Sequence, residues 1–188
     1  YRVLLTKLKD HFKAFPRRRG HLGVMISHLD IYKRFLTQTT AQYCLVFEDD
    51  CELQCENFSN TVKEALKKID PQFDMLLFGY HIDKNFHPTH EDHNKDIRYK
   101  NGFLKFHQFC GLHCYIVSRK GAQTFLDELA SPFWYIDWAI SELSYDKKLN
   151  IYGIFPPVAG QPAVFKVHVQ NIDYNYDWKD TFQSTTHW

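Results

Sequence analysis

Three consecutive carboxylates, Glu48-Asp49-Asp50, are the residues of this sequence whose type and spacing point most clearly to chemistry. In an extended chain Glu48 and Asp50 point to one side and Asp49 points to the other. Carboxylates held this close repel one another, and a hard divalent cation removes that repulsion. Such a cation could in turn bind a diphosphate. A solvated acidic turn is the alternative, and for a bare triplet it is the commoner explanation.

The elements that must position this triplet can be read from the spacing of apolar residues. The triplet follows a short apolar run at residues 42–47, which has the length of a strand and which we expect to be buried. Carboxylates at the C-terminal end of such a strand lie where α/β sheets bind ligands. Further apolar runs predict strands at residues 73–79, 112–118, 151–155 and 163–169. Apolar residues at helical spacing predict helices at residues 21–36, 58–69, 122–129 and 136–149.

The order of these elements predicts the fold class. Strands that alternate with helices indicate an α/β domain with a mixed, mostly parallel sheet flanked by helices. At 188 residues the chain has the size of one domain, so we expect a single domain over residues 1–188. The polar stretch at residues 81–107 predicts a long surface loop, ordered at most into short strands.

The composition excludes several classes of protein. With 23 basic and 22 acidic side chains, the chain lacks the basic excess of a dedicated nucleic-acid binder. The charge is nevertheless uneven, since residues 1–34 carry nine basic and two acidic side chains. No apolar stretch approaches the roughly 20 residues of a membrane span. Aromatic residues make up 16% of the chain, which favours a heavily packed core or a cleft with flat faces for sugars or bases.

The five cysteines do not have the spacing of a secreted disulfide scaffold, which favours free thiols in a reducing compartment. We therefore expect a cytoplasmic protein, and the secretory lumen is the less favoured location. A zinc site built from Cys51, Cys55, Cys110 and Cys114 is disfavoured. Cys110 and Cys114 would lie roughly 13 Å apart along the predicted strand, too far for ligands of one tetrahedral site.

An ordered series of motifs carries a resemblance to a known family. It consists of GHLGVMISH at residues 20–28, LVFEDD at 45–50, FDMLLFG at 73–79, CYIVSRKGA at 114–122, Ile136-Asp137, and FPPVAGQ at 155–161. This series resembles glycosyltransferase family 25, the lipopolysaccharide and collagen-galactosyltransferase group, over most of residues 17–165. Two features depart from the family pattern. Val24 replaces a usual cysteine, and the first 20 residues show no counterpart of the N-terminal strand that contacts the base. We therefore expect a trimmed or minimal enzyme.

The resemblance implies a GT-A-like fold and a metal-dependent, hexosyltransferase-like enzyme. It implies a nucleotide-sugar donor, most often UDP-linked, and a divalent metal, Mn²⁺ or Mg²⁺. The acceptor would be a hydroxyl of a glycan or glycoprotein, and the family pattern suggests inversion of configuration at the transferred sugar.

The same resemblance implies roles for the acidic triplet and for its partners. Asp50 would bind the metal directly, Glu48 would bind the metal or the donor ribose, and Asp49 would bind the ribose. Ser27 and His28 occupy the Ser-His positions of the family helix and would contact the donor. The remaining expectations are His168 as a third metal ligand, Asp137 as the base that deprotonates the acceptor hydroxyl, and Arg19, with Arg17 and Arg18, beside the diphosphate.

Several alternatives stay open at the level of sequence. A lone strand histidine such as His168 is more often structural than metal-bound, and His107 and His113 are weaker metal candidates. Trp134, Tyr135 and Trp138, which flank Asp137, form either part of the core or a stacking platform for a sugar ring. A Mg²⁺-dependent phosphotransferase and a non-catalytic carbohydrate-binding or interaction module are the competing functions.

Overall fold

The computed structural model describes residues 19–81, 98–105, 109–129, 135–146 and 149–161. Its helices are α2 (Arg19–Gln38), α3 (Phe58–Lys68), α4 (Arg119–Glu128) and α5 (Ile136–Tyr145). Its strands are β1 (Tyr43–Phe47), β2 (Glu52–Leu53), β3 (Met75–His81), β4 (Arg98–Lys100), β5 (Phe103–Lys105), β6 (Cys110–Ser118), β7 (Ile151–Ile154) and β8 (Ala159–Gly160). Every predicted helix and strand within these ranges is present. The predicted strand at residues 163–169 lies outside them.

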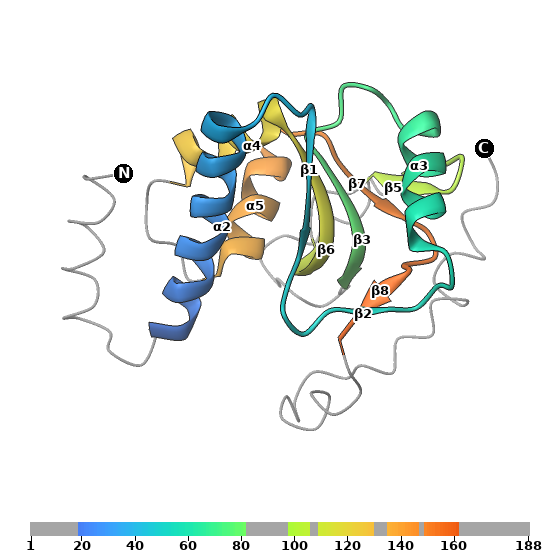
Figure 1. Cartoon of the computed structure of the whole chain (residues 1–188), viewed down its shortest axis with the longest axis horizontal. Coiled ribbons are helices and arrows are strands. Elements are labelled where there is room, and N and C mark those ends of the chain that lie inside the picture. Colours follow the sequence, from blue (N-terminus) through green and yellow to red (C-terminus); the bar gives the residue numbers. More distant parts are fainter. Residues whose placement is uncertain (1–18, 82–97, 106–108, 130–134, 147–148, 162–188) are drawn as a thin grey trace.

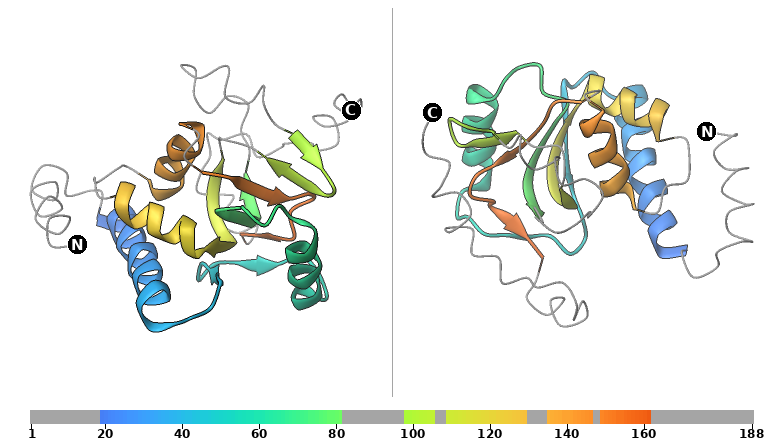
Figure 2. Two further views of the ribbon diagram at one scale, coloured as in Figure 1. Left: turned by 90° about the horizontal axis from the view of Figure 1, so that it is seen from above. Right: turned by 180° about the vertical axis from the view of Figure 1, so that it is seen from behind.

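Helices cover both faces of a sheet of six strands in the order β1-β6-β3-β7-β5-β4 (Figure 1). Helices α2, α4 and α5 lie together on one face and α3 lies on the other, and the views from above and behind agree (Figure 2). A separate two-stranded sheet pairs β2 with β8. The fold class is therefore α/β with a mixed sheet, as the sequence predicts.

The expectation that this sheet is mostly parallel is wrong. Among the described strands, β3 and β7 form a parallel pair, whereas the other neighbours in the six-stranded sheet are antiparallel. Strands β1 and β3 do run in the same direction, as a strand–helix–strand order predicts. However, β6 inserts between them and runs opposite to both, so the two strands never pair.

The centre of the sheet is the apolar core of the protein. In β3, Met75 and Leu77 face the layer of α2, α4 and α5, while Leu76 and Phe78 face α3, and all four are completely buried. This is the two-sided alternation of a central strand covered on both faces. Helix α2 contributes buried residues at helical spacing, namely Leu22, Met25, Leu29, Tyr32 and Phe35.

Strand β1 is less buried than its sequence predicts. It lies at the edge of the sheet, and Val46 is buried under the helix layer. Tyr43, Leu45 and Phe47 point to the opposite face and are 38, 41 and 45% exposed. An apolar run cannot distinguish a central strand from an edge strand, because that depends on which strands pair with it.

The antiparallel pairing of β1 with β6 determines what lies beside the acidic triplet. Phe47 pairs with Cys114, and the backbone N–H of Glu48 donates to the carbonyl oxygen of His113 at 3.0 Å. The start of α5 and the residue after β8 reach the same region, where Asp137 and Gln161 line one pocket with Glu48. No described helix combines the length and apolar character that crossing a membrane requires.

Candidate functional site

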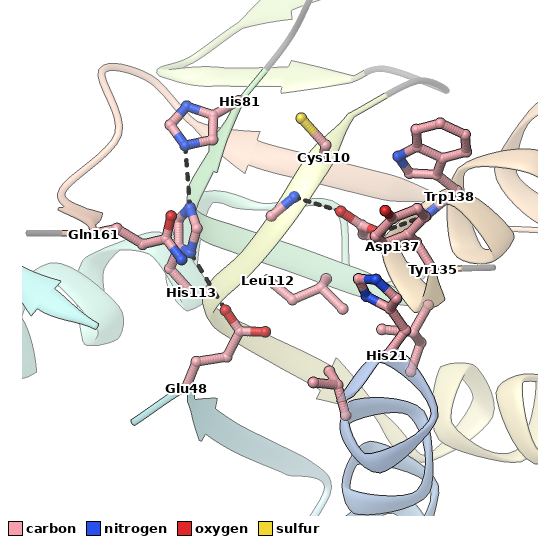
Figure 3. Close-up of a pocket in the computed structure, with 13 residues that line it drawn as sticks. His21, Glu48, His81, Cys110, Leu112, His113, Tyr135, Asp137, Trp138 and Gln161 are labelled. Atoms are coloured by element: carbon pink, nitrogen blue, oxygen red, sulfur yellow. Dashed lines mark hydrogen bonds and ion pairs between the residues drawn. The ribbon is translucent and has the colours of Figure 1, made fainter. Parts of the chain in front are cut away.

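A pocket of about 430 Å³ lies at this end of the sheet. Its wall includes Glu48 from the end of β1, His81 from β3, His113 from β6, Tyr135 and Asp137 from the start of α5, and Gln161 (Figure 3). Residues from distant parts of the chain therefore bring carboxylates, imidazoles and an aromatic ring to one cavity, which is typical of a ligand-binding site.

Glu48 is held between two histidines on this wall. Its Oε2 lies 3.3 Å from Nδ1 of His113, and its Oε1 lies 3.5 Å from Nε2 of His28. Burial raises the pKa of the Glu48 carboxyl group, but hydrogen bonds from His113 and His28 outweigh that effect and lower the pKa to about 2. Glu48 is thus an ionised carboxylate with both oxygens engaged.

Asp50 lies on the same side of the chain as Glu48 and has one oxygen without a partner. Its Oδ2 accepts a hydrogen bond from Nε2 of Gln161 at 2.7 Å, whereas its Oδ1 is buried and has no hydrogen-bond partner. A buried carboxylate oxygen left unpaired is costly, so its position calls for a donor or a cation.

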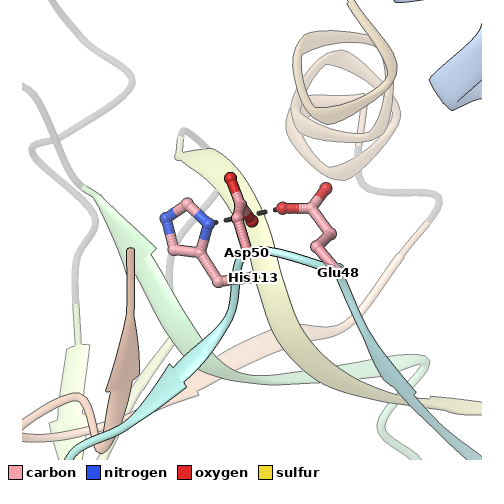
Figure 4. Close-up of side chains that lie close together, drawn as sticks. All are labelled: Glu48, Asp50 and His113. Atoms are coloured by element: carbon pink, nitrogen blue, oxygen red, sulfur yellow. Dashed lines mark hydrogen bonds and ion pairs between the residues drawn. The ribbon is translucent and has the colours of Figure 1, made fainter. Parts of the chain in front are cut away.

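Glu48, Asp50 and His113 together form a candidate metal site. One ligand atom from each lies within 4.8 Å of those of the other two (Figure 4). Carboxylate oxygens suit Mg²⁺ and Mn²⁺, and imidazole is a common ligand of transition metals. This set of donors, with the unpaired Oδ1 of Asp50, therefore fits a cation such as Mn²⁺.

Asp49 does not belong to this cluster, and the chain here forms a turn, closed by the backbone N–H of Cys51 and the carbonyl oxygen of Glu48, rather than the extended geometry assumed from the sequence. The side chain of Asp49 is exposed, and it belongs neither to the pocket wall nor to the candidate metal group. The structure thus brings Glu48 and Asp50 together and leaves Asp49 apart.

Asp137, the candidate base, lies on the opposite wall of the pocket at the start of α5. Its Oδ2 accepts a hydrogen bond from the backbone N–H of Gly111, and its Oδ1 accepts one from that of Trp138, both at 2.9 Å. Burial is the largest influence on the pKa of Asp137 and raises it. The two backbone donors oppose this effect, and the charge of Glu48 adds to it. A carboxyl group with a raised pKa at the start of a helix has the environment of a catalytic base.

An aromatic rim surrounds Asp137. Tyr135 is 38% exposed and lies against His21 of α2, with ring centroids 4.2 Å apart, and against Trp138, with centroids 5.1 Å apart. Trp138 is half-buried and lines the pocket, so it is not simply a core residue. Trp134 lies outside the described residues.

Neither Ser27 nor His28 lines this pocket, and their expected contact with the donor stays a prediction. Ser27 is exposed, and its hydroxyl donates to the carbonyl oxygen of Gly23 one turn earlier. His28 is buried behind Glu48 and is not part of the pocket wall. Adjacent helix residues point about 100° apart, so an inward His28 requires an outward Ser27.

The other expected site residues fall outside the part of the chain that the structure describes. His168, Arg17 and Arg18 are among them. Arg19 begins α2, but the placement of its side chain is not described. The metal and diphosphate roles expected for these residues remain predictions.

Comparison with known proteins identifies the family of the chain. A family model described as "Glycosyltransferase family 25 (LPS biosynthesis protein)" matches residues 16–140, which is well over half of the chain. The chain belongs to glycosyltransferase family 25. The match contains the acidic triplet, His113 and Asp137.

A viral protein is also similar to the chain. "Putative glycosyltransferase R655" of Acanthamoeba polyphaga mimivirus is 28% identical over 112 residues. The aligned region is 58% of this chain but spans only about a third, 34%, of the mimivirus protein.

The sequence indicates four residues of this site weakly or not at all. It makes His113 a weak metal candidate and gives His81, Gly111 and Gln161 no individual role. Gln161 ends the motif at residues 155–161, which was the available signal for it. His113 and Gly111 depend on the insertion of β6 beside β1, which local patterns do not reveal.

Proposed function

We propose that this glycosyltransferase transfers a hexose from a nucleotide-sugar donor, UDP-linked, to a hydroxyl of a glycan or glycoprotein, with Mn²⁺ or Mg²⁺ as its cofactor. The observation that carries the proposal is the unpaired, buried Oδ1 of Asp50 beside Glu48 and His113, in a pocket whose opposite wall carries Asp137. The family and the raised pKa of Asp137 support it.

The candidate metal group of Glu48, Asp50 and His113 would hold the cation, and through it the diphosphate. Asp50 is the first ligand, with His113 and Glu48 completing the set from this part of the chain. When bound, the cation would neutralise negative charge that develops on the departing nucleoside diphosphate. Of the two carboxylates expected at the donor ribose, Glu48 lies on the pocket wall and Asp49 does not, so we assign the ribose to Glu48 as a second role.

Asp137 would act on the acceptor. The N–H groups of Gly111 and Trp138 orient its carboxylate, and burial makes it a stronger base than an exposed aspartate. It would accept the proton of the acceptor hydroxyl as the new glycosidic bond forms on the face opposite the leaving diphosphate, which inverts the sugar. Tyr135 and Trp138 offer apolar faces beside that hydroxyl.

Ligand-induced stabilisation tests the donor class before any acceptor is known. A ligand at 100 times its Kd should raise the free energy of unfolding by about 2.7 kcal/mol. We expect UDP with Mn²⁺ to do so, and simple phosphate esters with Mg²⁺ to have no effect. Stabilisation by phosphate esters alone would favour the phosphotransferase. Stabilisation by free sugars, without UDP, would favour a carbohydrate-binding module.

A further inference from the structure

A chain of buried polar groups runs from the core of the protein to Glu48. The hydroxyl oxygens of Tyr32 and Tyr115 lie 2.8 Å apart, and that of Tyr115 lies 2.6 Å from Nδ1 of His28. Nε2 of His28 then faces Oε1 of Glu48 at 3.5 Å. Both tyrosines are 0% exposed and His28 is 4% exposed, so this chain is closed to solvent until it reaches the carboxylate.

When His28 is neutral, the hydrogen bonds of this chain have one consistent direction. The ionised carboxylate of Glu48 can only accept, so Nε2 of His28 must carry the proton that faces it. In a neutral imidazole the other nitrogen, Nδ1, is then an acceptor, and the hydroxyl of Tyr115 donates to it. The oxygen of Tyr115 remains free to accept from the hydroxyl of Tyr32. Each proton therefore points towards Glu48.

Strand β6 contacts Glu48 by two routes. His113 and Tyr115 both belong to this strand, two residues apart. His113 reaches Oε2 of Glu48 directly, and Tyr115 reaches Oε1 through His28. Strand β6 thereby orients a carboxylate that directly follows the edge strand β1. Phenylalanine would fill the site of Tyr115 equally well but would provide no donor for His28.

We propose that Tyr115 is a positioning residue for the metal and donor site: its hydroxyl holds His28 in the tautomer protonated at Nε2, and His28 in turn orients Glu48. The effect on cation affinity rests on the proposed function, whereas the tautomer of His28 does not. Hydrogen-bond partners of metal-binding side chains typically change metal affinity 10- to 100-fold when they are removed.

Two matched variants separate positioning from packing. Tyr115→Phe removes the hydroxyl that donates to His28, whereas Tyr32→Phe removes the same atom 2.8 Å further into the core and leaves that donor in place. Nitrogen-15 NMR of the imidazole reports the tautomer, and calorimetric titration with Mn²⁺ alone reports affinity. We expect Nε2–H in the wild type and in Tyr32→Phe, and a mixture of tautomers in Tyr115→Phe. Mn²⁺ affinity should fall at least about 10-fold in Tyr115→Phe and less than about 3-fold in Tyr32→Phe.

The outcomes distinguish this inference from the proposed function. An Nδ1–H or doubly protonated His28 in the wild type, or equal Mn²⁺ affinities in the two variants, would overturn the inference. If the tautomer behaves as expected but the wild type binds no Mn²⁺, the metal-dependent function fails and the positioning of His28 stands. Should Tyr115→Phe not fold, His28→Gln and His28→Asn replace it. Glutamine places its N–H group near the position of Nε2, so His28→Gln should retain Mn²⁺ affinity. The shorter asparagine does not reach that position, so His28→Asn should lose Mn²⁺ affinity.

Discussion

The backbone N–H of Gly111 donates a hydrogen bond to Oδ2 of Asp137 at 2.9 Å and so joins the start of β6 to the first turn of α5. Gly111 has φ +81°, and a Cβ at this position would lie 2.7 Å from Nε2 of His113. One glycine therefore touches both the candidate base and a candidate metal ligand, and a larger residue here should disturb both walls of the pocket.

Replacing Gly111 with alanine should disturb the site beyond the backbone strain itself. Gly102 is the matched control, because it also has a positive φ, +88°, but has open space where a Cβ would lie. Left-handed backbone strain should lower the free energy of unfolding by about 1–2 kcal/mol in Gly102→Ala. Gly111→Ala should lower the free energy of unfolding by more than Gly102→Ala does, as urea unfolding would measure. It should also weaken Mn²⁺ binding, as calorimetry would measure. Equal effects of the two variants on both quantities would argue against the contact with His113.

Asp137→Asn should remove the base while leaving the donor site intact. Turnover should fall by roughly 10²- to 10⁴-fold, with the affinity for UDP and Mn²⁺ changed only slightly. Because burial raises the pKa of Asp137, kcat/KM of the wild type should fall with decreasing pH earlier than an ordinary aspartate would predict.

The stability of the same variant checks the sign of that shift. A raised pKa in the folded state means that the wild type loses stability as pH rises from the ordinary value through the raised one. Asp137→Asn should not show this loss. If neither the stability nor the activity of the wild type changes with pH in this range, the raised pKa of Asp137 is contradicted.

Glu48 should make the protein sensitive to acid. Its pKa of about 2, against an ordinary 4.5, means that the ionised form stabilises the fold by about 3 kcal/mol above pH 4.5. This contribution should be lost as pH falls from 4.5 towards 2. The free energy of unfolding of Glu48→Gln should therefore approach that of the wild type in this range. Glu64→Gln, which removes an exposed carboxylate paired with Lys67, should change little at any of these pH values.

The aromatic rim should bind the sugar ring of the acceptor. Tyr135→Ala should weaken the binding of methyl hexopyranosides, measured by saturation-transfer NMR, with only a small loss of stability because Tyr135 is 38% exposed. Tyr145→Ala is the matched control, since Tyr145 is 40% exposed at the last position of α5, the helix that Tyr135 precedes, but does not line the pocket. If both variants bind these sugars equally well, Tyr135 has no role in a sugar platform.

Much of the fold could be predicted because its signals are local. The helical spacing of Leu22, Met25 and Leu29 identifies α2, and the apolar run of β3 identifies a central strand. The predicted closeness of Glu48 and Asp50 is observed, but it arises in a turn closed by the backbone N–H of Cys51 and the carbonyl oxygen of Glu48, not from alternation along an extended chain.

The rest of the site could not be predicted because it depends on which strands pair. His113 reaches Glu48 only because β6 lies antiparallel beside β1, and a mostly parallel sheet would have separated them. Tyr115 looks like a core aromatic in the sequence, and its role depends on a hydrogen bond to a helix 87 residues away in the chain. The contact of His28 with Glu48 likewise depends on the packing of α2 against the sheet, which the sequence pattern does not reveal.

Hydrolysis of nucleotide sugars with and without Mn²⁺ tests the central claim most directly. The wild type should release UDP from at least one UDP-sugar with Mn²⁺, and removal of the metal by a chelator should abolish that activity. Asp50→Asn should reduce release at least about 100-fold, whereas Glu52→Gln, which alters an exposed carboxylate on β2, should leave it unchanged. Metal-independent release of UDP, or an Asp50→Asn variant as active as Glu52→Gln, would contradict the account.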